Sequence, residues 1–342
     1  MIEFDNIDIS VVIPVYNAGD FIHTCLDSII AQEGNYKYEI ILVDDGSTDN
    51  SVDVIQQYEK SEELVRSDGS IVLMQQQNAG PSKARNRAIE AARGRYLAFI
   101  DADDYWKPEF FKRTVDFLDK HEECIGVSVL QQVDTVSGTH VSPVIPNDGL
   151  SEKEASRYAD GYIIKDFFRF WGERMHICPG GAMMRTDVVK ATGGMREDLR
   201  ITEDLEFWGY SALFGKWGLI PEVLFMGCGA QTVTSREDWI RRMKRRWDNA
   251  PTVEEWEKRL ARKQPNLLND ESYHVVQGAI ARNLAYCQLL SGRTKLARKE
   301  TIKYSKYITK DSIGKLMGLA KWSPFTWWGL CRFLKWREWH RK

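Results

Sequence analysis

The sequence predicts an α/β protein in which a mostly parallel sheet is flanked by helices and followed by a helical extension. Two observations lead to this prediction. Short apolar, β-branched runs alternate with segments of helical spacing along the first third of the chain, which favours a parallel sheet with right-handed crossovers. Beyond about Ser235 the strand-like runs stop and helical spacing takes over. We therefore expect two domains, residues 1–234 and residues 235–342.

Four strands are expected first, each followed by a helix. The strands are expected at Ile9 to Val15, Glu39 to Val43, Ile71 to Met74 and Tyr96 to Ile100. Gly19 and Asp20 precede the first helix, Ser47 or Thr48 can cap the second, Pro81 suits the first turn of the third and Pro108 opens the fourth.

Later elements are shorter and less regular. Residues 131–147 alternate like a hairpin or a loop excursion, and Gly180-Gly181 forms a turn before a short strand. Thr202-Glu203-Asp204 opens a helix, and Lys216 to Ile220 reads as the next strand.

Polar residues follow every one of the first four strands. Ligands in open parallel sheets bind beyond the carboxyl ends of the strands, so these clusters should meet on one edge. The clusters are Pro14 to Asn17, Asp44-Asp45, Gln77-Asn78 and Asp101 to Asp104.

The acidic turn Asp101-Ala102-Asp103-Asp104 is the strongest single indication of chemistry. Crowded carboxylates repel one another, and a hard divalent cation commonly relieves the repulsion, so we favour a metal site. The alternative is that these acids only cap the helices that follow. The similar pair Asp44-Asp45 at an earlier strand end weakens that alternative.

Composition excludes several classes of protein. Hydrophobic residues at 43%, charged residues at 28% and a net charge of −2 describe a globular protein without a general attraction to nucleic acid. The six cysteines are scattered, so we expect neither a zinc site nor a disulfide framework. There is no signal peptide pattern after Met1 and no apolar run long enough to span a bilayer, which leads us to expect a cytoplasmic protein.

Five stretches then occur in an order that resembles a known family. They are Val-Ile-Pro-Val-Tyr-Asn at 12–17, Val-Asp-Asp-Gly-Ser-Thr-Asp at 43–49, Asn-Ala-Gly and Ala-Arg-Asn within 78–86, Asp-Ala-Asp-Asp at 101–104 and Glu-Asp at 203–204. Together they resemble the inverting family-2 nucleotide-sugar glycosyltransferases with the GT-A fold. The resemblance covers roughly residues 8–225 and implies a Rossmann-like GT-A sheet.

The resemblance also implies roles for individual residues. Pro14, Tyr16 and Asp45 would line the nucleobase pocket beside Asn17, and Arg85, with Asn78 and Gly80, would hold the nucleotide from the other side. Asp103 would ligate Mn²⁺ or Mg²⁺ at the diphosphate, with Asp101 by the ribose or the metal's water shell. Asp204 would be the catalytic base, with Glu203 as its neighbour.

Each role has a structural alternative. Pro14 and Tyr16 can merely shape the exit of the first strand, and Arg85 can pair with a surface acid. Asp204 and Glu203 can be only a helix cap. Trp208, one turn beyond Asp204, can stack on an acceptor sugar or fill the core, and a lone helical aromatic is more often a core residue.

Departures from the family pattern narrow the expected reaction. Processive relatives carry Q-x-x-R-W and membrane spans, whereas the nearest match here, Met243 to Trp247, lacks the Gln. We therefore expect transfer of a single sugar from a nucleotide sugar, with UDP favoured by the resemblance, to a saccharide or lipid-linked saccharide. The alternatives are a non-catalytic nucleotide-binding or scaffold protein, and a nucleotidyltransferase, whose usual glycine-rich loop is absent after the first strand.

The last residues, 321–342, combine aromatic and basic side chains. Six basic residues stand there against Glu338 alone, together with five tryptophans. This mixture suits the boundary between water and anionic lipid, which predicts a peripheral position on the inner face of the cell membrane. The tail can instead pack on the helical region or on another subunit.

Overall fold

The structure is a computed structural model of the chain. It describes residues 7–135, 138–142, 160–175, 177–228, 236–308 and 311–340. The chain forms two compact units. Unit 1 consists of Met1–Phe167, Arg174–Glu197 and Phe207–Thr232; unit 2 consists of Phe168–Glu173, Asp198–Glu206 and Val233–Lys342.

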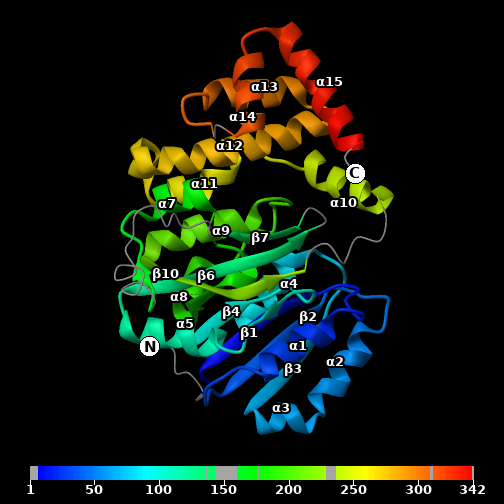
Figure 1. Cartoon of the computed structure of the whole chain (residues 1–342), viewed down its shortest axis with the longest axis vertical. Helices are drawn as coiled ribbons and strands as arrows, with labels where there is room; N and C mark the ends of the chain where they lie inside the picture. Colours follow the sequence, from blue (N-terminus) through cyan, green and yellow to red (C-terminus); the bar gives the residue numbers. More distant parts are fainter. Residues whose placement is uncertain are drawn as a thin grey trace. The chain divides into compact units, whose positions relative to one another are not determined.

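Unit 1 is built on one mixed sheet with flanking helices (Figure 1). The strand order is β3-β2-β1-β4-β9-β6-β10-β5, with β7 paired to β6 and β8 paired to β10. The strands are β1 Ile9–Val15, β2 Tyr38–Asp44, β3 Gly69–Gln75, β4 Tyr96–Phe99, β5 Tyr105–Trp106, β6 Cys124–Thr135, β7 Gly138–Ser142, β8 Tyr162–Ile163, β9 Ala182–Arg185 and β10 Lys216–Gly227.

The helices of unit 1 connect and cover these strands. They are α1 Ile22–Ile30, α2 Ser51–Glu59, α3 Glu62–Arg66, α4 Pro81–Ala91, α5 Phe110–Lys120 and α8 Thr186–Thr192, with the short 3₁₀ turns η1 Pro179–Gly181 and η2 Ala212–Phe214. Helices α7 Phe167–Arg174 and α9 Glu203–Ser211 each contribute residues to both units.

The first four strands in the order run parallel, as predicted. Asp44 of β2 lies opposite both Val15 of β1 and Gln75 of β3, and Val12 of β1 lies opposite Phe99 of β4. The carboxyl ends of all four strands therefore lie at the same edge of the sheet. The predicted α/β fold is confirmed. The sheet as a whole is mixed rather than mostly parallel, because β9 joins the parallel strands to the rest by antiparallel pairing with β4 and β6.

Alternating residues of these strands build a core on both faces of the sheet. On one face Ile9, Val11 and Ile13 pack in a cluster with residues of α1, α2 and α5. On the other, the ring of Phe99 contacts the rings of Phe207 and Trp208 in α9. Burial on both faces explains why these strands read as continuous apolar runs.

Three local features differ from the sequence-based expectation. Helix α2 begins at Ser51, so the prediction that Ser47 or Thr48 caps it is wrong. The hairpin expected at 131–147 is present where β6 pairs with β7, but β6 begins earlier, at Cys124, and also pairs with the distant β10. Helix α3 was not expected. Leu64 is its only buried residue, so its sequence has no apolar residues repeating at helical spacing.

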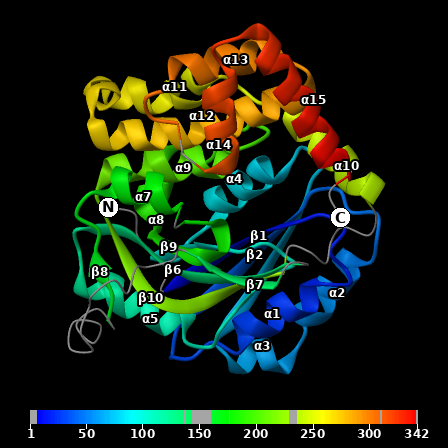
Figure 2. The same cartoon turned by 45° about the horizontal axis from the view of Figure 1, so that its top comes forward.

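Unit 2 is helical and has its own core. Its helices are α10 Arg236–Asp248, α11 Val253–Lys263, α12 Glu271–Ser291, α13 Thr294–Lys303, α14 Ser312–Ala320 and α15 Pro324–His340, with η3 Pro265–Asn269. Capping side chains begin three of them: Thr252 for α11, Asp270 for α12 and Asp311 for α14. Figure 2 shows these helices in yellow to red.

Long helix α12 is central to this packing. Leu289 and Ala285 of α12 are buried in a cluster with Met317, Trp327 and Leu334. A Cβ at Gly278 would lie 1.8 Å from the carbonyl oxygen of Tyr307, so only glycine allows this close approach. None of the helices in the described ranges is both long and apolar enough to cross a bilayer.

Candidate active site

The turn after β1 is hydrogen bonded to the turn after β2. Asn17 has φ 51°, a left-handed conformation that Asn adopts more readily than most residues. Its N–H donates to Ser47 Oγ at 2.9 Å, and its Oδ1 accepts from the Thr48 N–H at 2.8 Å. Next to it, Pro14 is half-buried and Tyr16 is 55% exposed. The contacts hold the loop and leave the Tyr16 ring accessible to a ligand.

Asp45 is a buried carboxylate that organises the loop after β3. Its Oδ1 accepts from Gln76 Nε2 and from the Ala79 N–H, both at 2.8 Å. Its Oδ2 accepts from the Gly80 N–H at 2.8 Å. A carboxylate has about four lone-pair sites, so Asp45 keeps the capacity to accept one further hydrogen bond, such as one from a ring N–H.

Two glycines allow these turns to approach each other. Gly80 has φ 98° and immediately precedes α4, a conformation that favours glycine. Gly46 has φ 79°, and a Cβ there would lie 3.1 Å from the backbone nitrogen of Asn78. The Asn78 side chain itself is exposed at this edge.

Arg85 of α4 joins the first half of the site to the acidic turn. Its Nη2 lies 2.5 Å from Asp101 Oδ1, and the side chain of Arg85 is buried whereas that of Asp101 is partly exposed. Sequence reasoning left open that Arg85 pairs with a surface acid. Arg85 instead pairs with Asp101, one of the predicted site acids, so the two residues belong to one arrangement.

The acidic turn is closed by its own backbone and by β10. The Asp104 N–H donates to the Asp101 carbonyl oxygen at 3.0 Å, and Asp104 Oδ1 accepts from the Cys228 N–H at 2.7 Å. The pKa of Asp104 is raised to about 8, mainly because the carboxyl is buried. The negative charge of Asp101 and, to a smaller extent, that of Asp103 raise the pKa further, whereas the hydrogen bond from the Cys228 N–H lowers it. The carboxylate repulsion inferred from the sequence is therefore present in the fold.

The donor chemistry of this turn suits a hard divalent cation. Asp101 and Asp103 supply partly exposed carboxylate oxygens, the ligand type that Mg²⁺ and Mn²⁺ prefer. Across the described ranges, no group of three or more His, Cys, Asp or Glu is arranged to hold a metal ion. Mg²⁺ bound with a nucleotide commonly takes only one or two protein carboxylates, the rest coming from phosphates and water.

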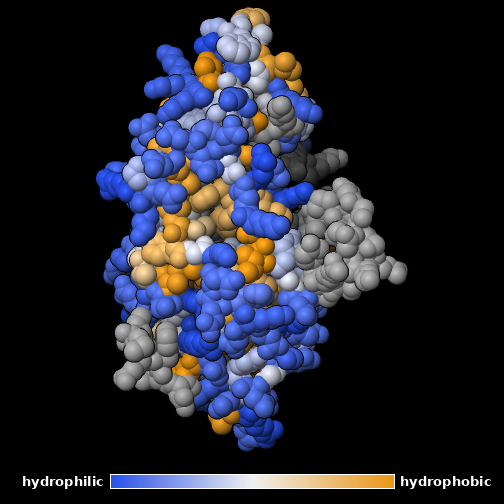
Figure 3. Space-filling view, turned by 90° about the vertical axis from the view of Figure 1, so that its left-hand side faces the viewer, coloured by the Kyte–Doolittle hydropathy of each residue, from blue (hydrophilic) through white to orange (hydrophobic). Residues whose placement is uncertain are grey.

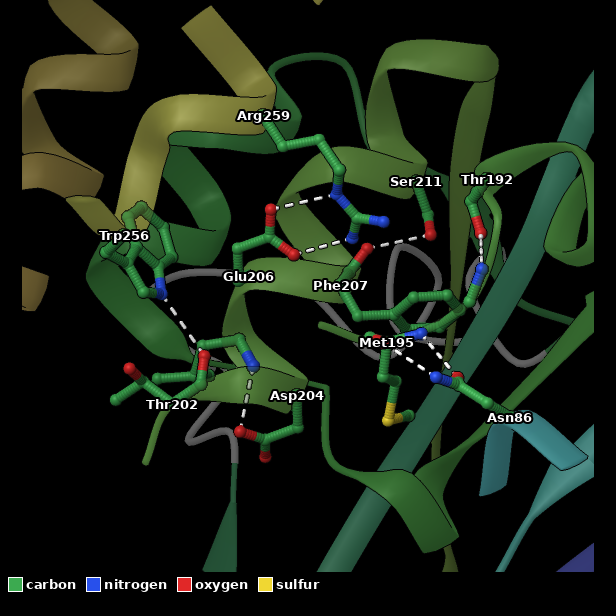
Figure 4. A network of polar contacts seen from close by, with 12 residues as sticks. Asn86, Thr192, Met195, Thr202, Asp204, Glu206, Phe207, Ser211, Trp256 and Arg259 are labelled. Carbon is green, nitrogen blue, oxygen red and sulfur yellow. Dashed lines mark hydrogen bonds and ion pairs between the residues drawn. The ribbon is translucent and has the colours of Figure 1, made fainter. Parts of the chain in front are cut away.

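Asp204 and Glu203 belong to unit 2, at the start of α9 (Figure 4). Asp204 Oδ1 accepts from the Leu205 N–H at 2.8 Å, so a backbone donor holds the carboxylate, and the side chain is half-buried. Just before the helix, Thr202 has φ 57°, which is rare for a β-branched residue.

Helix α11 holds this strained helix start from within the same unit. Trp256 Nε1 donates to the Thr202 carbonyl oxygen at 3.1 Å. One turn further along α9, the fully buried Glu206 accepts two hydrogen bonds from the guanidinium of Arg259, at 3.0 and 2.5 Å. Figure 4 shows both contacts beside Asp204.

Comparison with known proteins decides the family. The family model described as Glycosyl transferase family 2 matches residues 10–193, more than half of the 342 residues. The chain belongs to this family. The predicted resemblance to the family-2 glycosyltransferases is thereby confirmed.

Curated relatives each match about a third of the chain. An uncharacterized glycosyltransferase of Escherichia coli K12, YibD, is 48% identical over 104 residues, 30% of this chain and 28% of the relative. The putative teichuronic acid biosynthesis glycosyltransferase TuaG of Bacillus subtilis is 41% identical over 110 residues, which are 32% of this chain and 41% of the relative. A poly(ribitol-phosphate) beta-glucosyltransferase of Bacillus spizizenii is 42% identical over 127 residues, which are 36% of this chain and 19% of the relative. The matches thus span less than half of each relative.

Solved structures share the fold over most of the chain. Residues 1–349 of Staphylococcus aureus TarS, also solved with UDP-GlcNAc, align with a TM-score of 0.52 and cover 90% of this chain and 90% of that one, at 19% identity. A Pyrobaculum calidifontis mannosyltransferase solved with GDP-Man and Mn²⁺ aligns with a TM-score of 0.54 at 16% identity, and the alignment covers 98% of this chain and 87% of that one. The expected GT-A-type fold is confirmed.

The structure brings most of the predicted unit 1 site residues to one sheet edge. Asn17 contacts the loop after Asp45, Asp45 holds Gly80, and Arg85 holds Asp101. Trp208 is fully buried, and its ring contacts Phe99, Phe207 and Trp217. It fills the core here, which is the alternative that the sequence favoured for a lone helical aromatic.

Sequence reasoning gave three supporting residues of the quoted motifs no individual role. Asp49 Oδ2 accepts from the Gly19 N–H, and Asp104 holds the end of β10. The Asn86 side chain exchanges two hydrogen bonds with the backbone of Met195. All three lie within or beside the quoted motifs, but their partners are distant in sequence, so only the fold could identify their roles.

Proposed function

We propose that the chain is an inverting, metal-dependent glycosyltransferase that moves one sugar from a nucleotide sugar to a saccharide or lipid-linked saccharide. The observation that carries the proposal is the convergence of Asp45, Arg85 and the acidic turn at one edge of the sheet. Relatives named for teichuronic acid and poly(ribitol-phosphate) support a role in cell-surface polysaccharide synthesis.

The donor would bind across the ends of β1, β2 and β4. Asp45 accepts from a ring N–H of the nucleobase, with Pro14 and Tyr16 against the base and Asn17 fixing their loop. Arg85, Asn78 and Gly80 hold the nucleotide from the α4 side. UDP is the favoured carrier because a structural neighbour is solved with UDP-GlcNAc, and GDP is the second candidate because another is solved with GDP-Man.

Asp103 would hold Mn²⁺ or Mg²⁺, with Asp101 beside it. A divalent ion at the diphosphate stabilises the negative charge that develops on the leaving nucleotide. Arg85 keeps the Asp101 carboxylate oriented through their ion pair. A solved neighbour contains Mn²⁺, which supports the choice of metal.

Asp204 would act as the base in unit 2. Inversion in a single displacement requires a base that takes the proton of the acceptor hydroxyl opposite the leaving group. The bond from the Leu205 N–H to Oδ1 fixes the carboxylate and leaves Oδ2 for that proton. Glu203 and Trp208 complete the set proposed for acceptor binding, although Trp208 would have to become exposed to contact a sugar.

The wider assignment follows the same proposal. Residues 1–234 would form the glycosyltransferase domain and residues 235–342 a mostly helical region. The protein would work in the cytoplasm, at the inner face of the cell membrane, with residues 321–342 contacting anionic lipid. Arg341 and Lys342 of this segment lie outside the described residues.

A donor screen tests the reaction. The protein is incubated with UDP-GlcNAc, UDP-glucose and GDP-mannose, with and without Mn²⁺, and thermal shift and release of nucleoside diphosphate are measured. We expect one donor to raise the melting temperature only with metal and to be hydrolysed slowly. EDTA and Asp103→Ala should both abolish hydrolysis, whereas the exposed Asp53→Asn on α2 should not change it. Undiminished hydrolysis in Asp103→Ala contradicts the metal assignment.

A further inference from the structure

Helix α15 carries large apolar side chains on two opposite sides. One side is buried in the core of unit 2 through Trp327, Leu330 and Leu334. The other side remains 46–79% exposed through Phe325, Trp328, Phe333, Trp336 and Trp339. A helix that is apolar all round is normally covered on all sides, so the exposed side requires a partner. We propose that it docks flat on the surface of an anionic phospholipid bilayer, which deepens the membrane contact of the proposed function.

The proposed docking face continues onto the preceding helix. Leu319 of α14, Trp322 of the connecting turn and Phe325 are 77%, 72% and 79% exposed, and no large hydrophobic side chain in the described ranges is more exposed. Leu316 of α14 is also exposed. The docking face is therefore the exposed side of α15 together with Leu316, Leu319 and Trp322. Figure 3 shows a few apolar residues among hydrophilic ones at the top of the view.

The charges on this segment complement an anionic surface. Between Ser312 and His340 the only acidic residue is Glu338, which is buried and accepts hydrogen bonds from Tyr286 and Arg337. Exposed Lys315 and Arg332 and half-buried Lys335 supply positive charge. Basic residues near an anionic membrane are attracted to its surface, and salt weakens that attraction.

One cation is already placed against an aromatic ring of the docking face. The guanidinium of Arg332 lies 4.8 Å from the centre of the Trp328 ring. A cation over an aromatic ring keeps favourable electrostatics when it is partly desolvated, and tryptophan rings settle at the headgroup level of a bilayer. The pair therefore suits the lipid boundary better than it suits open water.

The same charges disfavour a second copy of the chain as the partner. A symmetric dimer through this face would bring the basic residues of both copies together, and no exposed carboxylate between Ser312 and His340 would balance them. Helix α15 has seventeen residues, so its aromatic side extends over about 25 Å. Its other side packs within unit 2, so α15 can present only the aromatic side and would lie parallel to the membrane plane.

Vesicle flotation tests the proposal with the full chain. Vesicles of phosphatidylcholine with 30% phosphatidylglycerol and vesicles of phosphatidylcholine alone are compared at low and high salt. The test variant is Leu319→Ser/Trp322→Ser/Phe325→Ser, with Arg332→Glu as the charge variant. Val65→Ser on α3 and Lys60→Glu at the end of α2 are matched controls, because both residues are exposed and belong to unit 1.

We expect wild type and both controls to float with the anionic vesicles and to be released by salt. The triple variant should bind at least about tenfold more weakly, and Arg332→Glu should lose several-fold. Equal flotation of wild type and triple variant overturns the proposal. The proposal is also overturned if the wild type fails to float and light scattering shows a dimeric wild type and a monomeric triple variant. The face would then be an interface between two copies of the chain.

Two further measurements keep the result interpretable. The melting temperature of the triple variant should match that of wild type, because the substituted side chains are exposed; Leu319→Ser alone is the fallback if it does not. Donor hydrolysis in solution is measured on the same preparations. A protein that hydrolyses donor but does not float contradicts the docking proposal alone, and one that floats but does not hydrolyse contradicts only the proposed reaction.

Discussion

Arg259 of α11 forms a two-pronged ion pair with Glu206 of α9, and Glu206 has no exposed surface. The pair lies one helical turn after the start of α9, where Asp204 is positioned. A buried carboxylate is stable as an ion only with such a partner, so this contact couples the helical region to the helix that carries the proposed base.

Removing the cation from this pair should strongly destabilise unit 2. Arg259→Ala removes the two hydrogen bonds that the guanidinium donates to buried Glu206, and breaking a buried ion pair typically costs about 3–5 kcal/mol. The free energy of unfolding from a denaturant titration measures the loss. Arg262→Ala, an exposed arginine on the same helix, should change it by less than about 0.5 kcal/mol. Equal effects of the two variants would mean that the pair is not a main stabilising contact.

The hydrogen bond from Trp256 to Thr202 should affect catalysis more than stability. Trp256→Phe removes the Nε1 donor and keeps most of the packing, so the stability loss should be about 1 kcal/mol. The helix start bearing Asp204 would relax, and the transfer rate should fall roughly tenfold with little change in the KM for the donor. Trp327→Phe is the matched control, since Trp327 also donates to a carbonyl in unit 2, that of Thr294. A similar loss of rate in both variants would argue against a positioning role.

Asp45 should matter for both the loop and the donor. Asp45→Asn replaces one acceptor oxygen by an amide group, so a backbone N–H of Ala79 or Gly80 loses its acceptor at a cost of about 1–3 kcal/mol. Donor affinity, measured by calorimetry with Mn²⁺ present, should fall at least about tenfold. Asp53→Asn serves as the control. An unchanged affinity would remove Asp45 from the donor site.

Asp49 should make the turn before α2 sensitive to acid. Burial acts to raise the pKa of Asp49, but hydrogen bonds from the Ser51 hydroxyl and the N–H groups of Gly19 and Ser51 lower it below its ordinary value. A carboxyl whose pKa is lower in the folded protein than in the unfolded protein stabilises the fold at pH values above its pKa in the unfolded protein, about 4. This stabilisation is lost as the pH falls through the pKa that the carboxyl has in the folded protein. The stability difference between wild type and Asp49→Asn should therefore shrink between pH 6 and pH 2.5.

Titration of Asp49 by NMR checks the cause of that acid sensitivity. Ser51→Ala removes the hydroxyl donor, so the pKa of Asp49 should rise toward its ordinary value. If the pKa stays unchanged in Ser51→Ala, the hydroxyl is not what lowers it.

The parallel half of the sheet could be predicted because its signals are local. Strands β1, β2 and β4 are buried on both faces and therefore appear as continuous apolar runs, with polar residues directly at their ends. That Asp45 and Asn78 lie at the same edge was predicted from their positions at the carboxyl ends of parallel strands, whereas the role of Gly80 came from the family resemblance. The pairing of β6 with β10 could not be predicted, because it joins residues about ninety positions apart without a periodic signal.

Side-chain partners were much harder to predict than positions. Ser47 and Thr48 looked like helix caps, but Asn17 binds both of them instead, because the turn after β1 needs those groups to close. Arg85 was assigned to the nucleotide, and its bond to Asp101 became visible only in the folded chain, where α4 packs against β1 and β2. The Glu206–Arg259 pair left no trace in the sequence, since neither residue belongs to a motif.

The rate of donor hydrolysis in Asp204→Asn tests the central claim most directly. The variant removes the proposed base but keeps the shape of the side chain, and Asp53→Asn on α2 is its control. With the donor identified by the screen and Mn²⁺ present, the account predicts that Asp204→Asn lowers the rate of diphosphate release at least about a hundredfold while donor affinity stays unchanged. Release at the wild-type rate in Asp204→Asn would contradict the account.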